Sequence, residues 1–308
     1  MTRRILLIAN PSAAAGRAVA RWEKLLGDLE RCRLKVDYVL TERPRHAVDL
    51  AKEAAVKYDV VVAVGGDGTV NEVASGLLLA GETGCLLGVI PVGTGNDVAQ
   101  MAGVSTVDDA VRALAEGPLQ SVDVIEVVCE ESGRRATRFA LLYAAVGFAG
   151  ELLKHTTAEV KKIFGSHYCY TFGFFRALFT YESPTMQVKC DDREFAGRMF
   201  LVSAGNAEIV GAGTMRLSPG ARTDDGMLNV NVVEELGRLE VARWFPRLLM
   251  GTHTTHPKVH YFPANSVSIE SQPAMEVQVD GELFGCTPAT FTVKPKALRV
   301  ITGWGLGE

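Results

Sequence analysis

The stretch from Val64 to Val73, VGGDGTVNEV, places an aspartate inside a glycine turn between a valine run and a helical pattern. A strand, a glycine turn and a helix in this order present backbone N–H groups and the positive end of a helix dipole, which favour a phosphate. Asp67 would repel that phosphate unless a cation lay between them. We therefore interpret Asp67 as a residue that meets a phosphate bound with Mg2+, as a ligand or through metal-bound water. An ordinary turn aspartate is the alternative.

A second glycine turn follows one unit later, in IPVGTGNDVAQ from Ile90 to Gln100, where Asn96 and Asp97 open the next helix. Two such turns at the carboxyl ends of neighbouring parallel strands would line one crevice. Neither turn completes G-x-G-x-x-G, and the chain has no G-x-x-x-x-G-K-[ST], so dinucleotide and P-loop motifs are disfavoured. Thr69 and Glu72 also have the spacing of a capping box, which predicts that the helix after the first glycine turn starts at Thr69.

A third stretch is VDGE, from Val279 to Glu282, in which Asp280 and Gly281 form a pair that is frequent in hairpin turns.

These motifs, in this order, resemble the diacylglycerol kinase catalytic family, which includes soluble bacterial lipid kinases and, more distantly, the sphingosine kinases. The resemblance runs from about Arg4 to Gly303 and also includes NPSAAAG, AAVGF, AGNAEIVGAG and LSPGARTDDGMLNV. GGDGT alone is shared with NAD kinases, so the ordered set carries the specificity. One departure is at Ala14 and Ala15, where relatives often have another glycine or a basic residue.

The resemblance implies an ATP-dependent, Mg2+-dependent kinase that phosphorylates the hydroxyl of diacylglycerol or a related lipid, with Asp280 or Glu282 as the base. It implies a catalytic Mg2+ network at Asp67, Asp97 and Asp123. It implies a structural Mg2+ site at Asp225 with the main-chain carbonyls of Arg222 and Met227. The nucleotide contacts that it implies are Asn10, Thr41, Gly65, Gly66, Asp67, Gly68, Thr69, Asn71, Thr94 and Asn96.

Two other functions remain open. An NAD kinase would share GGDGT, but the second half of the chain resembles the lipid enzymes. A catalytically silent lipid- or nucleotide-binding protein would have no need for Asp280 and Glu282 beside Asp67.

The elements that must position these residues change character along the chain. Up to residue 127, strands predicted at 4–10, 35–41, 59–65 and 86–93 alternate with helices at 16–32, 45–57 and 69–80. This alternation predicts a Rossmann-like α/β domain with a parallel sheet. From residue 128 to 291, β-rich runs at 137–147, 193–205, 226–235, 265–271 and 274–284 predict an all-β domain, a β-sandwich that would hold the lipid. Residues 292–308 are expected to return to the first domain. The fold class is therefore α/β plus all-β.

Composition limits the partners and the compartment. The 308 residues carry a net charge of -4, and no basic tract with interleaved aromatic residues suggests nucleic acid. The longest apolar run, Phe139 to Gly150, is too short to span a bilayer. Six cysteines without a C-x-x-C pair, and no export signal, predict reduced thiols and a cytoplasmic protein.

An aromatic-rich segment from Tyr168 to Tyr181 could be a buried packing element, a wall for acyl chains or a contact with the bilayer interface. With a net charge of -4, we expect transient peripheral membrane association that is weak and largely hydrophobic. His253, His256 and His260 are interpreted as loop residues rather than as a zinc site. A homodimer stays open.

Overall fold

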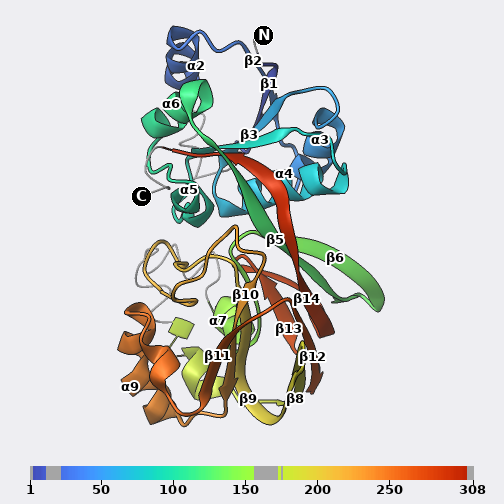
Figure 1. Cartoon of the computed structure of the whole chain (residues 1–308), viewed down its shortest axis with the longest axis vertical. Helices are drawn as coiled ribbons and strands as arrows, with labels where there is room; N and C mark the ends of the chain where they lie inside the picture. The colour runs from blue at the N-terminus through green and yellow to red at the C-terminus, as the bar shows by residue number, and fades with distance from the viewer. Residues whose placement is uncertain (1–2, 12–21, 156–172, 175, 304–308) are drawn as a thin grey trace. The chain divides into compact units, whose positions relative to one another are not determined.

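The computed structural model describes residues 3–11, 22–155, 173–174 and 176–303 (Figure 1). The chain forms two compact units. Unit 1 contains Met1–Val124, Gly211–Gly213 and Pro295–Glu308, and unit 2 contains Ile125–Val210 and Thr214–Lys294. Two of the boundaries lie within the long strands β5 (Leu119–Glu131) and β14 (Glu282–Ile301). The limits predicted from the sequence, after residue 127 and before residue 292, lie in the same two strands.

Unit 1 is built on a parallel sheet whose strands run in the order β14-β4-β3-β1-β2. The four predicted strands are confirmed, and their bounds are β1 (Ile5–Ala9), β2 (Val36–Leu40), β3 (Val60–Gly65) and β4 (Leu86–Pro91). Every residue of β1, β3 and β4 is buried. Helices cover both faces of such a sheet, which explains why these strands read as continuous apolar runs.

Helices of unit 1 pack in two pairs. Helix α3 (His46–Ala54) packs on α4 (Asp67–Leu79), whereas α2 (Trp22–Arg31) packs on α6 (Val107–Glu116), which contacts β4. The short helix α5 (Asp97–Met101) lies against α4 and β4. In Figure 1 the two pairs flank the sheet. Unit 1 is thus a parallel α/β unit, and its finer Rossmann-like class stays a prediction.

The predicted capping box of α4 is wrong. The helix begins at Asp67 with Gly66 as the N-cap, and no side chain caps it. Glu72 instead accepts the backbone N–H of Arg45 at 3.1 Å. Thr69 is buried in the first turn, where a Cβ on Gly65 would stand 2.4 Å from its Oγ1. Because glycine leaves this space, the chain enters the helix two residues earlier than the sequence pattern indicates.

Unit 2 is an antiparallel β structure whose strand pairs close into a ring. The ring runs β9-β8-β12-β14-β13-β7 and back to β9. In it the long strand β9 pairs with β7 and β8, and the long strand β14 pairs with β12 and β13. The bounds are β7 (Tyr143–Gly147), β8 (Thr185–Cys190), β9 (Arg193–Gly205), β12 (Ser266–Gln272) and β13 (Glu276–Val279). Three further strands extend it, β6 (Arg134–Ala140) beside β5, and β10 (Leu228–Glu234) and β11 (Val259–Ala264) beyond β9.

The core of unit 2 is enclosed by these strands and includes Ile125, Met186, Leu228, Ile269 and Phe291. Alternating burial along β8 shows how one face of a strand fills this core while the other faces solvent. The β-rich second unit predicted from the sequence is therefore present. The run at 137–147, predicted as one strand, is two strands that break at Leu141 and Leu142.

A second apolar cluster of unit 2, called here the aromatic cluster, lies between α7 (Phe148–His155), a helix at 176–180 and α9 (Arg238–Leu249). The Phe148 and Phe200 rings stack with centroids 4.6 Å apart. Phe174, Ala177 and Leu178 are buried in the cluster, so this part of the predicted aromatic segment is a packing element. Residues 168–172 and 175 of that segment, and Ala14 and Ala15, lie outside the described residues.

Within the described residues, no helix is long and apolar enough to cross a membrane. The five described cysteines are free thiols, and Cys169 lies outside the described residues. Burial raises the pKa of the Cys85 thiol to about 11, so this thiol is protonated at neutral pH.

Candidate active site

The carboxyl ends of β1 to β4 meet at one edge of the unit 1 sheet. Ala9 lies opposite Leu40 and Val64, and Gly65 lies opposite Pro91. The residues that follow these strands are joined to them by main-chain hydrogen bonds, from Asn10 N to Val64 O at 3.2 Å and from Thr41 N to Ala9 O at 2.9 Å. The predicted nucleotide contacts at Asn10, at Thr41 and in both glycine turns are therefore brought together.

The two glycine turns touch each other. A Cβ on Gly93 would stand 2.5 Å from the Cα of Gly66. The two turns can therefore lie this close together only because position 93 is a glycine. Asn96, with a φ of 58°, braces its own turn, because its side chain accepts the N–H of Gly93 and donates to the Gly93 carbonyl, both at 3.0 Å. Thr94 is exposed on the turn that Asn96 holds.

Asp67 lies at the junction of the two turns as the first residue of α4, partly buried rather than on an exposed turn. Its Oδ1 accepts the N–H of Val98 at 3.0 Å, and a Cβ on Gly95 would stand 2.8 Å from its Oδ2. Burial raises the pKa of Asp67, and the nearby Asp97 carboxylate raises this pKa further, whereas the Val98 N–H opposes both. A second carboxylate beside a partly buried one favours a cation with hard oxygen ligands, which fits Mg2+.

The other two predicted Mg2+ carboxylates bind main-chain groups. Asp97 accepts the N–H groups of Ala212 and Gly213 at 3.0 and 2.9 Å, from a loop that belongs to unit 1. Asp123 is fully buried and accepts the N–H of Lys296 at 2.7 Å, which ties β5 to β14. In the described part of the chain, no three His, Cys, Asp or Glu residues group closely enough to hold a metal ion. The three carboxylates thus do not form a single ligand cluster, and the fit to Mg2+ rests on Asp67 and Asp97.

The remaining predicted nucleotide residues lie on α4 and its turn. Thr69 and Asn71 are buried, and Asn10 Nδ2 donates to Thr69 Oγ1 at 3.4 Å. Gly66 and Gly68 are only partly buried. The glycines therefore offer main-chain groups of this turn, whereas the side chains of Thr69 and Asn71 pack inward.

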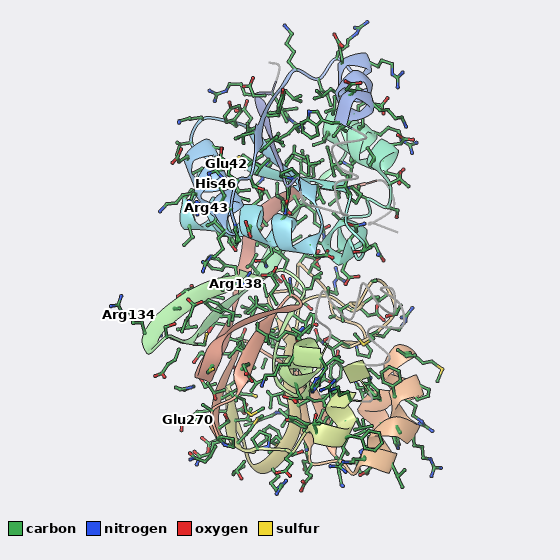
Figure 2. The ribbon with its side chains drawn as sticks, turned by 180° about the vertical axis from the view of Figure 1, so that it is seen from behind. Glu42, Arg43, His46, Arg134, Arg138 and Glu270 are labelled. Carbon is green, nitrogen blue, oxygen red and sulfur yellow. The ribbon has the colours of Figure 1, made fainter. Side chains whose placement is uncertain are left out.

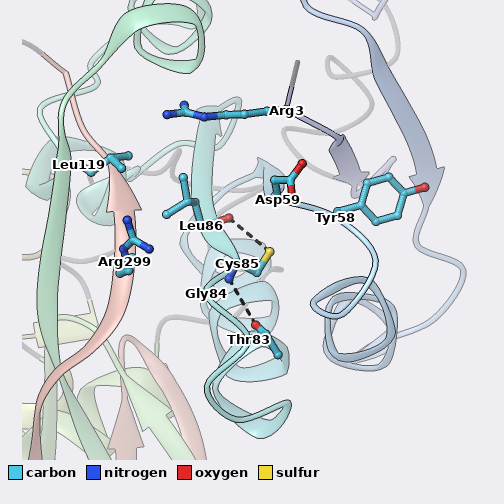
Figure 3. A pocket seen from close by; sticks show the side chains of 9 residues that line it. All are labelled: Arg3, Tyr58, Asp59, Thr83, Gly84, Cys85, Leu86, Leu119 and Arg299. Atoms are coloured by element: carbon cyan, nitrogen blue, oxygen red, sulfur yellow. Dashed lines mark hydrogen bonds between the residues drawn. The ribbon is translucent and has the colours of Figure 1, made fainter. Parts of the chain in front are cut away.

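A shallow cavity of about 260 Å³ lies at the amino ends of the same strands (Figure 3). Arg3, Asp59, Cys85 and Arg299 are among its lining residues. Asp59 and Cys85 directly precede β3 and β4, so this cavity is at the opposite strand ends from the glycine turns and contains none of the predicted site residues.

In unit 2, Asp280 and Gly281 form the hairpin turn between β13 and β14, with φ angles of 45° and 86°. The predicted hairpin is confirmed. The Asp280 carboxylate accepts three backbone N–H groups, from Leu141 at 2.7 Å and from Leu142 and Tyr143 at 2.9 Å. Leu141 and Leu142 form the break between β6 and β7, and Tyr143 begins β7, so Asp280 holds that break in place.

Glu282 follows two residues later and forms an ion pair with Arg138 of β6, which Figure 2 labels. The Arg138 side chain is 13% exposed and the Glu282 side chain 48% exposed, so a mostly buried guanidinium fixes an accessible carboxylate. The Arg138 guanidinium also lies 5.5 Å from the centre of the Phe284 ring. Arg138 is not predicted from the sequence, because no spacing pattern links two residues 144 positions apart.

The predicted structural Mg2+ residues lie in one turn. Asp225 is exposed, and its Oδ1 accepts the N–H of Met227 at 3.0 Å, whereas Asp224 pairs with Arg222 at 3.3 Å. A carboxylate beside main-chain carbonyls is a donor set that suits a hard divalent cation.

The three histidines have separate partners, but their interpretation as loop residues is wrong for two of them, since His253 begins a 3-10 helix (His253–Thr255) and His260 lies in β11. His253 contacts Asn231 at 3.3 Å, His256 pairs with Glu240 at 3.1 Å and His260 with Glu234 at 2.8 Å. Burial lowers the pKa of His253 to about 4, so it is neutral at physiological pH.

Comparison with known proteins agrees with these features. Residues 4–127 match the model of the diacylglycerol kinase catalytic domain, and residues 147–302 match that of the YegS C-terminal NAD kinase beta sandwich-like domain. Diacylglycerol kinases of Staphylococcus saprophyticus and Staphylococcus epidermidis are each 30% identical to this chain over 304 residues, which is 98% of this chain and 96% and 93% of theirs.

The chain belongs to the diacylglycerol kinase family. A crystal structure of a diacylglycerol kinase from Bacillus anthracis is similar to it, with a TM-score of 0.79, 25% identity and 98% of both chains covered. The resemblance found in the sequence is confirmed, and this diacylglycerol kinase family member is a kinase. Its second unit matches a sandwich-like domain, in agreement with the ring of strands in unit 2.

Proposed function

We propose that this kinase transfers the γ-phosphate of ATP, bound with Mg2+, to the hydroxyl of diacylglycerol or a closely related lipid. The observation that carries the proposal is Asp67, a partly buried carboxylate with a raised pKa at the point where two glycine turns touch. A phosphate at the N-terminus of α4 would meet main-chain N–H groups, and a carboxylate in the same place requires a cation. The relatives from the two Staphylococcus species are named diacylglycerol kinases, and these names suggest the lipid acceptor.

In unit 1, the residues present fit a magnesium nucleotide. Asp67 and Asp97 would hold Mg2+, which would offset the charge of the transferred phosphate. The glycines of both turns bring main-chain groups near the phosphates, and Asn96 keeps the second turn in the conformation that exposes Thr94. Asp123 holds β5 to β14 and so supports the edge of the sheet.

In unit 2, we assign the base to Glu282. Asp280 already accepts three backbone N–H groups, which leaves fewer lone pairs for a lipid hydroxyl. Glu282 is accessible and is oriented by Arg138. Asp280 then acts as a positioning residue, and Glu282 takes the proton of the attacking hydroxyl.

The test is purified full-length protein incubated with radiolabelled ATP and separate acceptors, with and without a Mg2+ chelator. Diacylglycerol in mixed micelles, sphingosine and NAD are the acceptors. We expect a labelled phospholipid from diacylglycerol that is lost when Mg2+ is chelated. Efficient labelling of NAD with every lipid untouched would instead support the NAD kinase alternative. Labelling of none would support a silent binding protein.

A further inference from the structure

Helix α9 of unit 2 has two different faces. Val241 is buried and Phe245 packs against the aromatic cluster, so one face of the helix is fixed in the interior. The opposite face carries Leu239, Arg243 and Pro246, and the C-cap residue Met250 continues the spacing of this helical stripe. Leu239 is 87% exposed and Met250 63% exposed. Two large apolar side chains are therefore exposed to solvent on one side of a helix whose other side already packs against the aromatic cluster.

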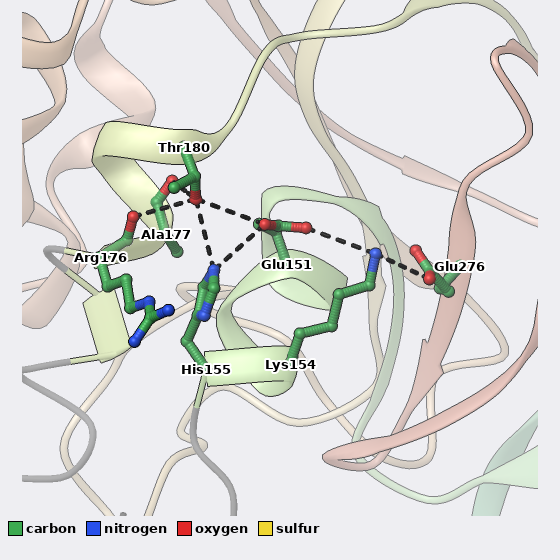
Figure 4. Close-up of polar contacts among 7 residues, drawn as sticks. All are labelled: Glu151, Lys154, His155, Arg176, Ala177, Thr180 and Glu276. Atoms are coloured by element: carbon green, nitrogen blue, oxygen red, sulfur yellow. Dashed lines mark hydrogen bonds and ion pairs between the residues drawn. The ribbon is translucent and has the colours of Figure 1, made fainter.

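An exposed aromatic side chain adjoins this helix. Phe179, on the helix at 176–180, is 65% exposed, and the Arg238 guanidinium lies 5.9 Å from the centre of its ring. The 176–180 helix is anchored by Thr180, whose hydroxyl contacts His155 at 3.3 Å and Glu151 at 3.4 Å on α7 (Figure 4). Phe179 is thus presented beside the N-terminus of α9 by a helix that α7 and the aromatic cluster hold.

The same surface is basic. Arg238, Arg243 and Arg247 lie on α9, and Arg176 is exposed on the neighbouring helix. Within residues 22–155, 173–174 and 176–303, no carboxylate forms an ion pair with any of these four arginines. The one acidic residue of α9 is Glu240, which is occupied by Lys258 at 3.3 Å and His256 at 3.1 Å. We call the exposed set of Phe179, Arg238, Leu239, Arg243 and Met250 the α9 face.

We propose that the α9 face docks on a membrane surface that contains anionic phospholipid. Apolar side chains that project between arginines match a lipid interface, where the side chains enter the acyl boundary and the guanidinium groups meet phosphates. This proposal rests on the proposed function, since the acceptor of a lipid kinase lies in a membrane. It also concerns local charge, which the net charge of -4 for the whole chain does not describe.

A second copy of the chain is the competing occupant of this face. In a symmetric dimer the same patch meets itself, so the arginines of one copy would lie near those of the other. This repulsion disfavours self-association through the α9 face, whereas anionic lipid removes the repulsion.

The experiment is sedimentation of the full-length protein with vesicles of phosphatidylcholine alone and of phosphatidylcholine mixed with phosphatidylglycerol. The double variant Leu239→Glu and Arg243→Glu is compared with Val56→Glu and Lys57→Glu in unit 1. The control makes the same two kinds of change, apolar to acidic and basic to acidic, at exposed positions, since Val56 is 71% exposed and Lys57 is exposed. We expect binding to the anionic vesicles to weaken about tenfold or more in the α9 variant and to be unchanged in the control.

Kinase activity separates this proposal from the proposed function. The α9 variant should phosphorylate vesicle-embedded diacylglycerol more slowly, yet retain wild-type turnover of a short-chain diacylglycerol dissolved as monomers. If the wild type phosphorylates no lipid, the proposed function is wrong, and the vesicle sedimentation still tests docking independently. Equal vesicle binding by both double variants would overturn the docking proposal. The docking proposal would also be overturned if sedimentation velocity showed that the wild type and the control are dimers and the α9 variant is a monomer.

Discussion

Asp67 in unit 1 and Asp280 in unit 2 are both followed by glycine, yet their environments differ. Asp67 begins a helix, accepts the N–H of Val98 and lies close to a second carboxylate, and burial raises its pKa. Asp280 lies in a hairpin turn and accepts three backbone N–H groups. The first environment destabilises the ionised carboxylate of Asp67, whereas the second occupies the Asp280 carboxylate with main-chain hydrogen bonds.

By this difference, the Asp67 carboxylate is expected to bind a cation, whereas the Asp280 carboxylate holds main-chain groups in place. An ionised group kept in an unfavourable environment is typical of functional sites, because folding alone would not retain it. A carboxylate saturated by N–H groups contributes to stability. Two Asp-Gly pairs in one chain therefore have different expected roles, and substitutions can test this assignment.

The largest effect is expected for Asp67→Asn. The amide keeps the size of the side chain and can still accept the Val98 N–H, but it removes the charge that would hold Mg2+. We expect phosphorylation of diacylglycerol to fall about a thousandfold, in line with the loss of a transition-state charge contact. Steady-state assays measure this loss, and circular dichroism checks that the fold is kept. Activity within tenfold of wild type would remove Asp67 from the mechanism.

Asp280→Asn and Glu282→Gln should separate stability from catalysis. Glu282→Gln removes the proposed base while its amide oxygen can still accept from Arg138, so we expect about a hundredfold lower turnover with little change in melting temperature. Asp280→Asn presents an NH2 group to main-chain donors, so we expect about 1 to 3 kcal/mol of lost stability. Thermal melts and turnover of both variants check the pair. The reverse pattern would make Asp280 the base.

His253 extends the comparison to a buried titratable group that we assign to stability alone. Burial lowers its pKa from 6.5 to about 4 in the folded protein. Between these values the unfolded chain binds a proton that the folded chain does not, so stability falls as the pH falls from 6.5 to 4. The loss amounts to about 3 kcal/mol at most. Urea unfolding of wild type and His253→Gln at several pH values should show this loss only in the wild type.

Turnover of the His253→Gln variant at pH 7 supplies the control for that assignment. A residue that acts on stability alone leaves turnover unchanged where the variant is folded. A thousandfold loss of turnover in the folded variant would place His253 in the reaction.

The smallest effect is expected at Asp225, which is exposed and accepts the N–H of Met227. If Mg2+ binds there, it stabilises the folded state by mass action, by about 1 to 3 kcal/mol at saturating metal. Asp225→Asn should remove the dependence of the melting temperature on Mg2+, whereas the neighbouring Asp224→Asn should retain it. Scanning calorimetry at increasing Mg2+ measures both, and equal responses of the two variants would contradict the site.

The sequence by itself determined the elements and the turns of unit 1. Four apolar runs of the length of strands, separated by helical periodicity, predict a parallel sheet, and parallel strands place the residues after their carboxyl ends at one edge. The meeting of Asn10, Thr41 and both glycine turns follows from that rule. The Asp280-Gly281 hairpin follows from local turn preferences. Such features depend on residues that are close together in the chain, so they can be predicted from the sequence alone.

Only the tertiary structure decided which polar groups are already occupied. The start of α4 at Asp67 depends on the space that Gly65 leaves for Thr69. The three amides on Asp280 and the Arg138 partner of Glu282 come from strands about 140 positions away in the chain. No periodicity encodes such pairs, because a hydrogen bond or ion pair depends on distances that form only when distant strands pair. The physical reason that Asp67 and Asp280 differ is therefore their surroundings in the folded chain, not their sequence motifs.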